Sequence, residues 1–442
     1  MASTRLTRTV QSGGNRAKWT WSAWVKRSNL GATQTLFAAH ADSNNKTRLE
    51  IAADDELYFN DESGGNTNGR IVSTQKFRDV SGWYHIVAVW DKDNSTSGDR
   101  ILYYVNGTRI TSFSDTGNAP SGNSTMNNSS VTHEIGSENS GNYFSGYMSH
   151  IHFCDGYAYA ASDFGEADSN GVWKIKTSPS VSYGTTGYFI LKDGNSVTDQ
   201  SGNSNNWTVS GGTLTDDKDN PSNVFSTIDY ISTHASDYTF ANRNNKVSNS
   251  NGSTRITRGT LGASSGKYYF ETKIATVGGS GGFGTGLYVG VTDAEYFENL
   301  GTSQAFIGTG SNQVAQRGDG NHLAKNNTQI NGYESCSAGS ILRVALDLDN
   351  GYVYFGVNAT WGNSGDPTSG ATGTGGVSIT TGKTYMFGAS GYNGWSVETN
   401  FGNGYFGTTQ ISSEGTNASG NGVFEYDVPT GYTALCTKGL DS

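Results

Sequence analysis

Pairs of acidic residues at alternate positions are the first candidates for chemistry in this sequence. Retaining glycoside hydrolysis uses two carboxyl groups about 5 Å apart, and positions i and i+2 of a strand can supply such a pair. Glu166 with Asp168, and Glu425 with Asp427, have this spacing. Neither pair continues into the third acid of the pattern Glu-x-Asp-x-x-Glu. The sequence therefore favours a protein without catalytic residues over a glycan-degrading enzyme.

Other reactive residue types are scattered. His150 and His152 have the spacing of a metal-chelating pair on one strand face, but no third ligand lies near them in the sequence, and their apolar neighbours indicate sheet packing. The glycine-rich run 279–284 lacks the Lys-Ser/Thr pair and the helix of a phosphate-binding loop. The acidic run 54–56 has the composition of a solvated turn. We predict no metal ligands and no cofactor from these residues.

The composition indicates an all-β protein. The 442 residues include 61 Gly but 5 Pro, and the glycines cluster with Asn, Ser, Asp and Thr between short apolar runs. Such clusters are typical of β-turns, where glycine adopts positive φ without a steric clash. The 24 Tyr, 19 Phe and 9 Trp provide the apolar surface that a folded chain must bury. We therefore expect β-sandwiches with cores rich in aromatic residues.

Charge and cysteine content exclude several classes of partner. A net charge of −10 without a basic run argues against nucleic-acid binding. Cys154, Cys336 and Cys436 lie far apart, which argues against a disulfide framework and favours assembly in a reducing cytoplasm. We find no apolar run typical of a secretory signal or of a membrane span, so we expect no membrane association.

Period-two alternation defines the elements that must position any binding site. The residue pair Asn106-Gly107 separates two apolar runs and predicts a hairpin with a type I′ turn. The residues Asp349-Asn350-Gly351 predict a second hairpin. Alternation predicts strands over 19–25, 83–90, 101–105, 108–110, 143–153, 267–274, 287–291, 341–348 and 352–358.

Four motifs follow one another in the first part of the chain. They are WTWSAWVKRSN (19–29), GWYHIVAVWD (82–91), ILYYVNGTRI (101–110) and GNYFSGYMSHIHFCDGYAYAASDFGE (141–166). In this order they resemble a laminin-G-like, concanavalin-type jelly roll over about residues 5–165. The version that ends in DGYAYAASDFGE is similar to modules of tail and virion proteins of marine phages.

A second set of motifs occupies the last part of the chain. It comprises GKYYFETKI (266–274), LYVGVTD (287–293), GSILRVALDLDNGYVYFGVNATWG (339–362), VETNFGNGYFG (397–407) and VPTGYTALCTKGL (428–440). This set resembles a SPRY domain over about residues 250–442. The Gly/Ser/Thr-rich insertion 362–382 departs from the usual pattern of that family.

These observations divide the chain into three parts. We predict a laminin-G-like jelly roll over 1–165, a connecting segment with short strands over 166–250, and a SPRY-like sandwich over 251–442. The motif DQSGNSNNWTV (199–209) resembles the opening strand of a laminin-G-like module. The stretch 185–210 either completes the first sandwich or packs between the two modules, and the sequence leaves both alternatives open.

The resemblances imply where ligands would bind. Laminin-G-like modules often bind calcium through loop oxygens, and Asp91, Asp93 and Asp99 flank one loop, although solvated turn acids are the simpler interpretation.

In SPRY-like sandwiches, loops at one end form the recognition face. Trp361, Tyr392 and Trp395 lie in Gly/Asn-rich turns and are the predicted ligand-binding residues. An aromatic residue in such a turn either stacks on a ligand or closes the end of the sandwich.

The expected function follows from these resemblances. We expect a phage virion protein, such as a tail fibre, a receptor-binding protein or a head-decoration subunit, that binds a host-surface glycan or other virion proteins. A homo-oligomer is expected, with a trimer favoured, because trimers are the usual symmetry of fibres. The alternatives are a purely architectural virion protein without a receptor and, less favoured, a glycan-degrading enzyme.

Overall fold

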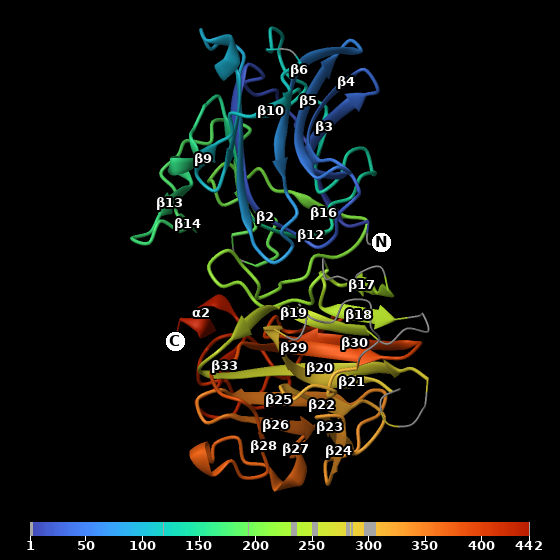
Figure 1. Ribbon diagram of the computed structural model, residues 1–442. Helices are drawn as coiled ribbons and strands as arrows, with labels where there is room; N and C mark the ends of the chain where they lie inside the picture. The colour runs from blue at the N-terminus through green and yellow to red at the C-terminus, as the bar shows by residue number, and fades with distance from the viewer. Residues whose placement is uncertain are drawn as a thin grey trace. The chain divides into compact units, whose positions relative to one another are not determined.

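The computed structural model describes residues 3–117, 119–192, 194–230, 237–249, 255–279, 283, 286–295 and 306–441. The chain divides into two compact units, Met1–Asp216 and Asp217–Ser442. In the described residues, the regular secondary structure of both units is mainly antiparallel strand, and the C-terminal helix α2 (Thr437–Leu440) has four residues (Figure 1). The all-β prediction is therefore confirmed. Within the described ranges, no helix has the length and apolarity needed to cross a membrane.

Two sheets form the first unit. The eight-stranded sheet has the order β10 (Phe113–Asp115), β6 (Asn66–Lys76), β5 (Glu56–Ser63), β4 (Asn45–Ile51), β3 (Gln34–Asp42), β11 (Thr132–Ile135), β1 (Arg5–Thr9) and β16 (Thr208–Ser210). The six-stranded sheet has the order β15 (Tyr188–Ile190), β12 (Gly146–Asp155), β2 (Lys18–Arg27), β7 (Tyr84–Asp91), β8 (Ile101–Val105) and β9 (Thr108–Arg109). A separate hairpin joins β13 (Gly165–Ala167) and β14 (Trp173–Ile175).

Aromatic side chains from both sheets fill the core of the first unit. Trp19 on β2 stacks against Trp90 on β7 with ring centroids 6.2 Å apart, and it also contacts Phe59 on β5. All three side chains are buried. Because large aromatic residues bury about 150–250 Å² each, they contribute much of the apolar surface between the two sheets, together with aliphatic residues of the same core.

The stretch 185–210 completes this sandwich. Strand β15 pairs with β12, and β16 pairs with β1, so each sheet gains an edge strand from this stretch. Trp207 is buried and contacts Tyr188 within the same core. The stretch expected to connect the modules is thus divided between the units at residue 216, although 231–236 and 250 lie outside the described residues.

Two further sheets form the second unit. The larger contains β17 (Thr239–Ala241), β18 (Lys246–Asn249), β30 (Trp395–Asn400), β20 (Lys267–Val277), β25 (Ile341–Asp347), β26 (Tyr352–Val357) and β27 (Thr360–Trp361) in this order, with β28 (Val377–Ser378) on β26 and β33 (Thr433–Ala434) on β20. The smaller contains β19 (Arg255–Ala263), β29 (Tyr385–Gly391), β21 (Tyr288–Asp293), β22 (Gln313–Arg317), β23 (His322–Lys325) and β24 (Thr328–Asn331). Strands β31 (Tyr405–Phe406) and β32 (Thr409–Gln410) form a separate hairpin.

The hairpin predicted around Asn350-Gly351 joins β25 to β26. The Asp347 carboxylate accepts hydrogen bonds from the Asn350 backbone N–H at 3.0 Å and from its side-chain amide at 2.8 Å, and Gly351 has φ +74°. The insertion 362–382 is ordered, and its strand β28 pairs with β26.

Candidate functional site

The three predicted ligand-binding aromatics differ in accessibility. Trp395 begins β30 and is 1% exposed, with its ring in the core 5.8 Å from that of Tyr238. Tyr392 lies in the turn before β30 and is 41% exposed. Trp361 ends β27 and is partly buried, with its ring 4.3 Å from the Arg343 guanidinium. Of the three, Tyr392 has the side chain most accessible to a ligand.

Sheet order separates Trp361 from Trp395. Strands β20, β25 and β26 lie between β30 and β27 in the sheet. At a strand spacing of about 4.8 Å, β30 and β27 are therefore about 19 Å apart. The structure therefore does not bring the three residues into one site. Trp395 closes the sandwich core, which was one of the two interpretations of a turn aromatic.

The acids around the loop after β7 each face a basic residue. Asp91 pairs with Lys18 at 3.1 Å, and Asp93 pairs with Lys92 at 2.5 Å. Asp99 pairs with Arg109. In the part of the chain that the structure describes, no group of three or more His, Cys, Asp or Glu side chains is arranged to hold a metal ion.

A β-bulge interrupts the alternation at His150 and His152. The register of β12 against β2 shifts between Ser149 and His152, and His150 has φ +48°. Both imidazoles pack against Phe189. The distance between ring centroids is 5.7 Å for His150 and 4.0 Å for His152. His152 is also within hydrogen-bond distance of the Tyr183 hydroxyl at 2.9 Å. These contacts agree with the packing interpretation.

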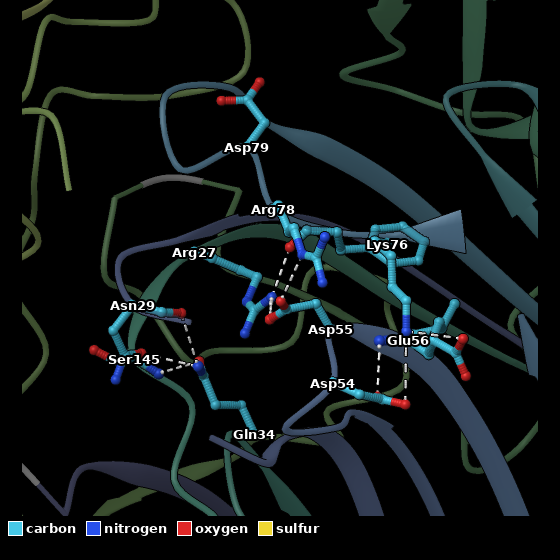
Figure 2. Close-up of polar contacts among 12 residues, drawn as sticks. Arg27, Asn29, Gln34, Asp54, Asp55, Glu56, Lys76, Arg78, Asp79 and Ser145 are labelled. Atoms are coloured by element: carbon cyan, nitrogen blue, oxygen red, sulfur yellow. Dashed lines mark hydrogen bonds and ion pairs between the residues drawn. The ribbon is translucent and has the colours of Figure 1, made fainter. Parts of the chain in front are cut away.

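A buried ion-pair cluster lies where β2, β4, β5 and β6 end or begin. Figure 2 shows the Asp55 carboxylate between Arg27, whose Nη1 is 2.9 Å away, and Arg78, whose Nε is 3.0 Å away. The Arg27 side chain is 0% exposed, whereas that of Arg78 is 60% exposed. Nearby, Gln34 donates to Asn29 at 2.8 Å and accepts from the Ser145 N–H at 3.0 Å (Figure 2). This cluster ties loops together through the ion pairs of Asp55, while Arg27 Nε and Nη2 have no hydrogen-bond partner.

A larger polar surface covers the side of the eight-stranded sheet that faces away from the core. It follows from alternation: Leu49, Ile51 and Phe59 point into the core, so the residues between them point outward. We call this surface the polar face. It consists of Arg5, His40, Lys46, Arg48, Glu50, Tyr58, Asn60, Glu62, Arg70, Asp115 and Glu134, with Glu138 from the segment after β11.

Arg48 is the centre of the polar face. Its guanidinium contacts Glu62 at 3.2 Å, Glu138 at 3.3 Å and Glu50 at 3.7 Å. Burial raises the pKa of Glu50, and the Arg48 charge opposes this effect. Three carboxylates of the polar face thus surround one guanidinium.

Three atoms around Arg48 have no hydrogen-bond partner. They are Arg48 Nε, Glu50 Oε2 and Asn60 Oδ1, and all three are buried. Glu50 is 9% exposed and Asn60 is 8% exposed, although both are on the outward side of the sheet. A buried polar atom without a partner costs about 1–3 kcal/mol. Because the three atoms are buried, a ligand reaches them only when neighbouring side chains move aside.

The polar face is absent from the site residues predicted from the sequence. The available signal was the alternation Lys46, Arg48, Glu50 along one strand and Tyr58, Asn60, Glu62 along the next. Chemically, the polar face offers acceptors, a donor and an aromatic ring. This set can hydrogen-bond a polyhydroxylated ligand.

Comparison with known proteins gives several structural likenesses. The SAP-like pentraxin from Limulus polyphemus has 19% identity and a TM-score of 0.27, and the match covers 36% of this chain and 72% of that chain. The SPRY domain of human HERC1 has 16% identity and a TM-score of 0.26, and the match covers 35% of this chain and 86% of that domain's chain. A putative carbohydrate binding protein from Bacteroides ovatus has 15% identity and a TM-score of 0.31, and the match covers 48% of this chain and 57% of that chain. The curated proteins contain no match.

A family profile matches part of the first unit. The matched residues, 4–161, run from β1 through β12 and include every residue of the polar face. This stretch is similar to the concanavalin A-like lectin/glucanases superfamily, in agreement with the predicted jelly roll.

Proposed function

We propose that this chain is a glycan-binding, adhesive component of a phage virion, and that the polar face of the first unit is its binding surface. The observation that carries the proposal is a pair of buried acceptors without a hydrogen-bond partner, Glu50 Oε2 and Asn60 Oδ1. They lie beside Arg48 Nε, which is 3.7 Å from Glu50 Oε1 and also has no hydrogen bond. A sugar hydroxyl both donates and accepts, so one ligand could satisfy all three atoms. The superfamily match over 4–161 supports the same ligand class.

The virion location is proposed from the sequence resemblance to tail and virion modules of marine phages. Subunits of a particle are present in many copies, and we propose a homo-oligomer, with a trimer favoured. Multivalent display converts weak single sites into strong attachment, because the second contact forms at high effective concentration. A hydrogen-bonding surface with a weak single site would therefore be sufficient for host attachment.

We propose binding without catalysis, cofactor or metal. Two carboxylates of the polar face, those of Glu62 and Glu138, are held by Arg48 in ion pairs. Carboxylates engaged in ion pairs with Arg48 are less free to attack a substrate, which supports recognition instead of bond cleavage.

A glycan array probed with the purified chain tests the binding proposal. We expect retained glycans whose binding is weakened in Asn60→Ala and unchanged in Arg78→Met, a variant outside the polar face. No retained glycan, or binding that Asn60→Ala leaves unchanged, would contradict the proposed site. Release of reducing sugar from a bound polysaccharide would contradict the absence of catalysis.

Mass spectrometry of purified phage particles, with immunogold labelling, tests the location. We expect the chain on the particle, and the label would distinguish tail from head. Absence from the particle would overturn the virion proposal. Presence on the particle without glycan binding would favour a purely architectural role.

A further inference from the structure

The charges on the polar face are already paired with one another. Arg48 contacts three carboxylates, as described above. The remaining basic residues each contact an acid within 4 Å, namely Lys46 with Glu62 at 3.5 Å, Arg70 with Asp115 at 3.0 Å, and Arg5 with Glu134 at 3.8 Å. No lysine or arginine of the polar face is left as a free cation for an anionic ligand.

The unpartnered oxygens require a donor. An amide Oδ1 accepts only, and an ionised carboxylate accepts only. A carboxylated or sulfated sugar would bring further acceptors toward Glu50, Glu62 and Glu138, and like charges at such distances repel one another. Neutral hydroxyls avoid this repulsion and supply the missing protons.

The unpartnered atoms lie at neighbouring register positions. Asn60 on β5 lies directly opposite Arg48 on β4, and Tyr58 lies directly opposite Glu50. Directly opposed Cβ atoms are about 5 Å apart, so the four side chains define a small patch on two strands. Arg70 lies 5.8 Å from the centre of the Tyr58 ring and supports one side of it. A donor, two acceptors and a ring in such a patch match the alternating hydroxyls and apolar C–H faces of a sugar.

From this pattern we infer that the polar face selects an uncharged, hydroxyl-rich glycan and rejects carboxylated and sulfated glycans. The inference rests on the proposed function of the same surface. The selective elements are Glu50, Glu62 and Glu138 as excluding charges, and Glu50 with Asn60 as acceptors. Arg48 holds the carboxylates in place and donates through Nε.

Titration calorimetry with defined polysaccharides tests this selectivity. The neutral probes are laminarin, dextran and mannan, and the anionic probes are alginate and chondroitin sulfate. We expect at least one neutral probe to bind, with each anionic probe weaker by about ten-fold or more, equivalent to about 1.4 kcal/mol. Asn60→Ala should weaken the neutral probe about five-fold, the loss expected for one hydrogen bond, whereas Arg78→Met should match the wild type.

A charge variant separates the possible failures. Glu62→Gln should raise the affinity for anionic probes while the melting temperature stays close to wild type, because it removes one excluding charge. Anionic probes that bind as tightly as neutral ones overturn the inference. If Asn60→Ala weakens the binding of these probes, the polar face still binds glycans, and the proposed function stands without the selectivity. If no probe binds and the glycan array is also empty, the proposed function itself fails.

Discussion

Removing the charge of Asp55 tests how the first unit holds a buried guanidinium. Arg27 is fully buried, and its Nη1 donates to Asp55 at 2.9 Å and to the Phe77 carbonyl at 2.6 Å. Asp55→Asn keeps the shape of the side chain, and asparagine tolerates the positive φ of +70° at this position. The substitution therefore isolates the effect of charge.

The expected cost follows from the burial of Arg27. Breaking a buried ion pair by removing one partner costs about 3–5 kcal/mol, because the other charge stays in a low-dielectric environment. We expect about 3 kcal/mol, the lower end, because Asp55 also contacts the exposed Arg78. Arg78→Met should cost less than about 1 kcal/mol, as for other exposed pairs. Adding Arg27→Met to Asp55→Asn should recover part of the loss, since the stranded charge is removed.

Urea unfolding followed by tryptophan fluorescence measures these free energies, with unchanged m-values as the control for compactness. The pKa of Asp55 adds a second readout: burial raises it, but hydrogen bonds from Arg78 and Arg27 outweigh burial and hold it below the usual value of 3.8. A lowered carboxyl pKa stabilises the fold above that usual value, and this stability is lost as the pH falls through the lowered pKa. The difference in free energy of unfolding between wild type and Asp55→Asn should therefore become smaller as the pH falls through the lowered pKa of Asp55. A cost below about 1 kcal/mol, or no recovery with Arg27→Met, would refute the reasoning.

Three further substitutions give distinct expectations. Trp395→Ala should lower the free energy of unfolding of the second unit by about 3–5 kcal/mol, because it empties a site in the core. Tyr392→Ala should lower it by less than about 1 kcal/mol, because that side chain is exposed. Equal effects of the two substitutions in a denaturation experiment would contradict the difference in burial. Burial raises the pKa of Glu271 to about 6, so its contribution to stability is complete below its usual value of 4.5 and is lost as the pH rises through about 6. As the pH rises from 4.5 to about 6, the free energy of unfolding measured by denaturation should decrease in wild type and stay constant in Glu271→Gln. Trp173→Ala removes the 3.0 Å hydrogen bond from its Nε1 to His85 Nδ1, and limited proteolysis should then cut the β13–β14 hairpin faster than in wild type; unchanged cleavage would argue against a role for Trp173 in holding the hairpin.

Alternation and turn chemistry predicted much of the fold because both are local. The run 341–348, the turn ending at Gly351 and the run 352–358 correspond to β25, its turn and β26. The stretch 185–210 could not be placed, because β15 and β16 are three residues long and their partners lie far away in the sequence. Edge pairing of this kind depends on which sheet positions remain open.

The candidate site was harder to predict than the strands. The polar face depends on Arg48 meeting acids from a neighbouring strand and from Glu138, which is 90 residues away in the sequence. The bulge at His150 breaks an alternation that the sequence shows as regular. Trp395 follows a Gly- and Asn-rich turn and looks like a loop residue, yet it is the first residue of a central strand. Each of these features depends on long-range register.

The two edge strands supplied by 185–210 also limit how the first unit can be excised. The matched region stops at residue 161, before β15 and β16. A fragment cut there would leave one side of β12 and one side of β1 with open backbone hydrogen-bonding groups, and Tyr188 and Trp207 would be missing from its core. Open strand edges pair with those of other chains, so such a fragment should aggregate. Residue 216, and not residue 161, is therefore the natural end of a self-contained first unit.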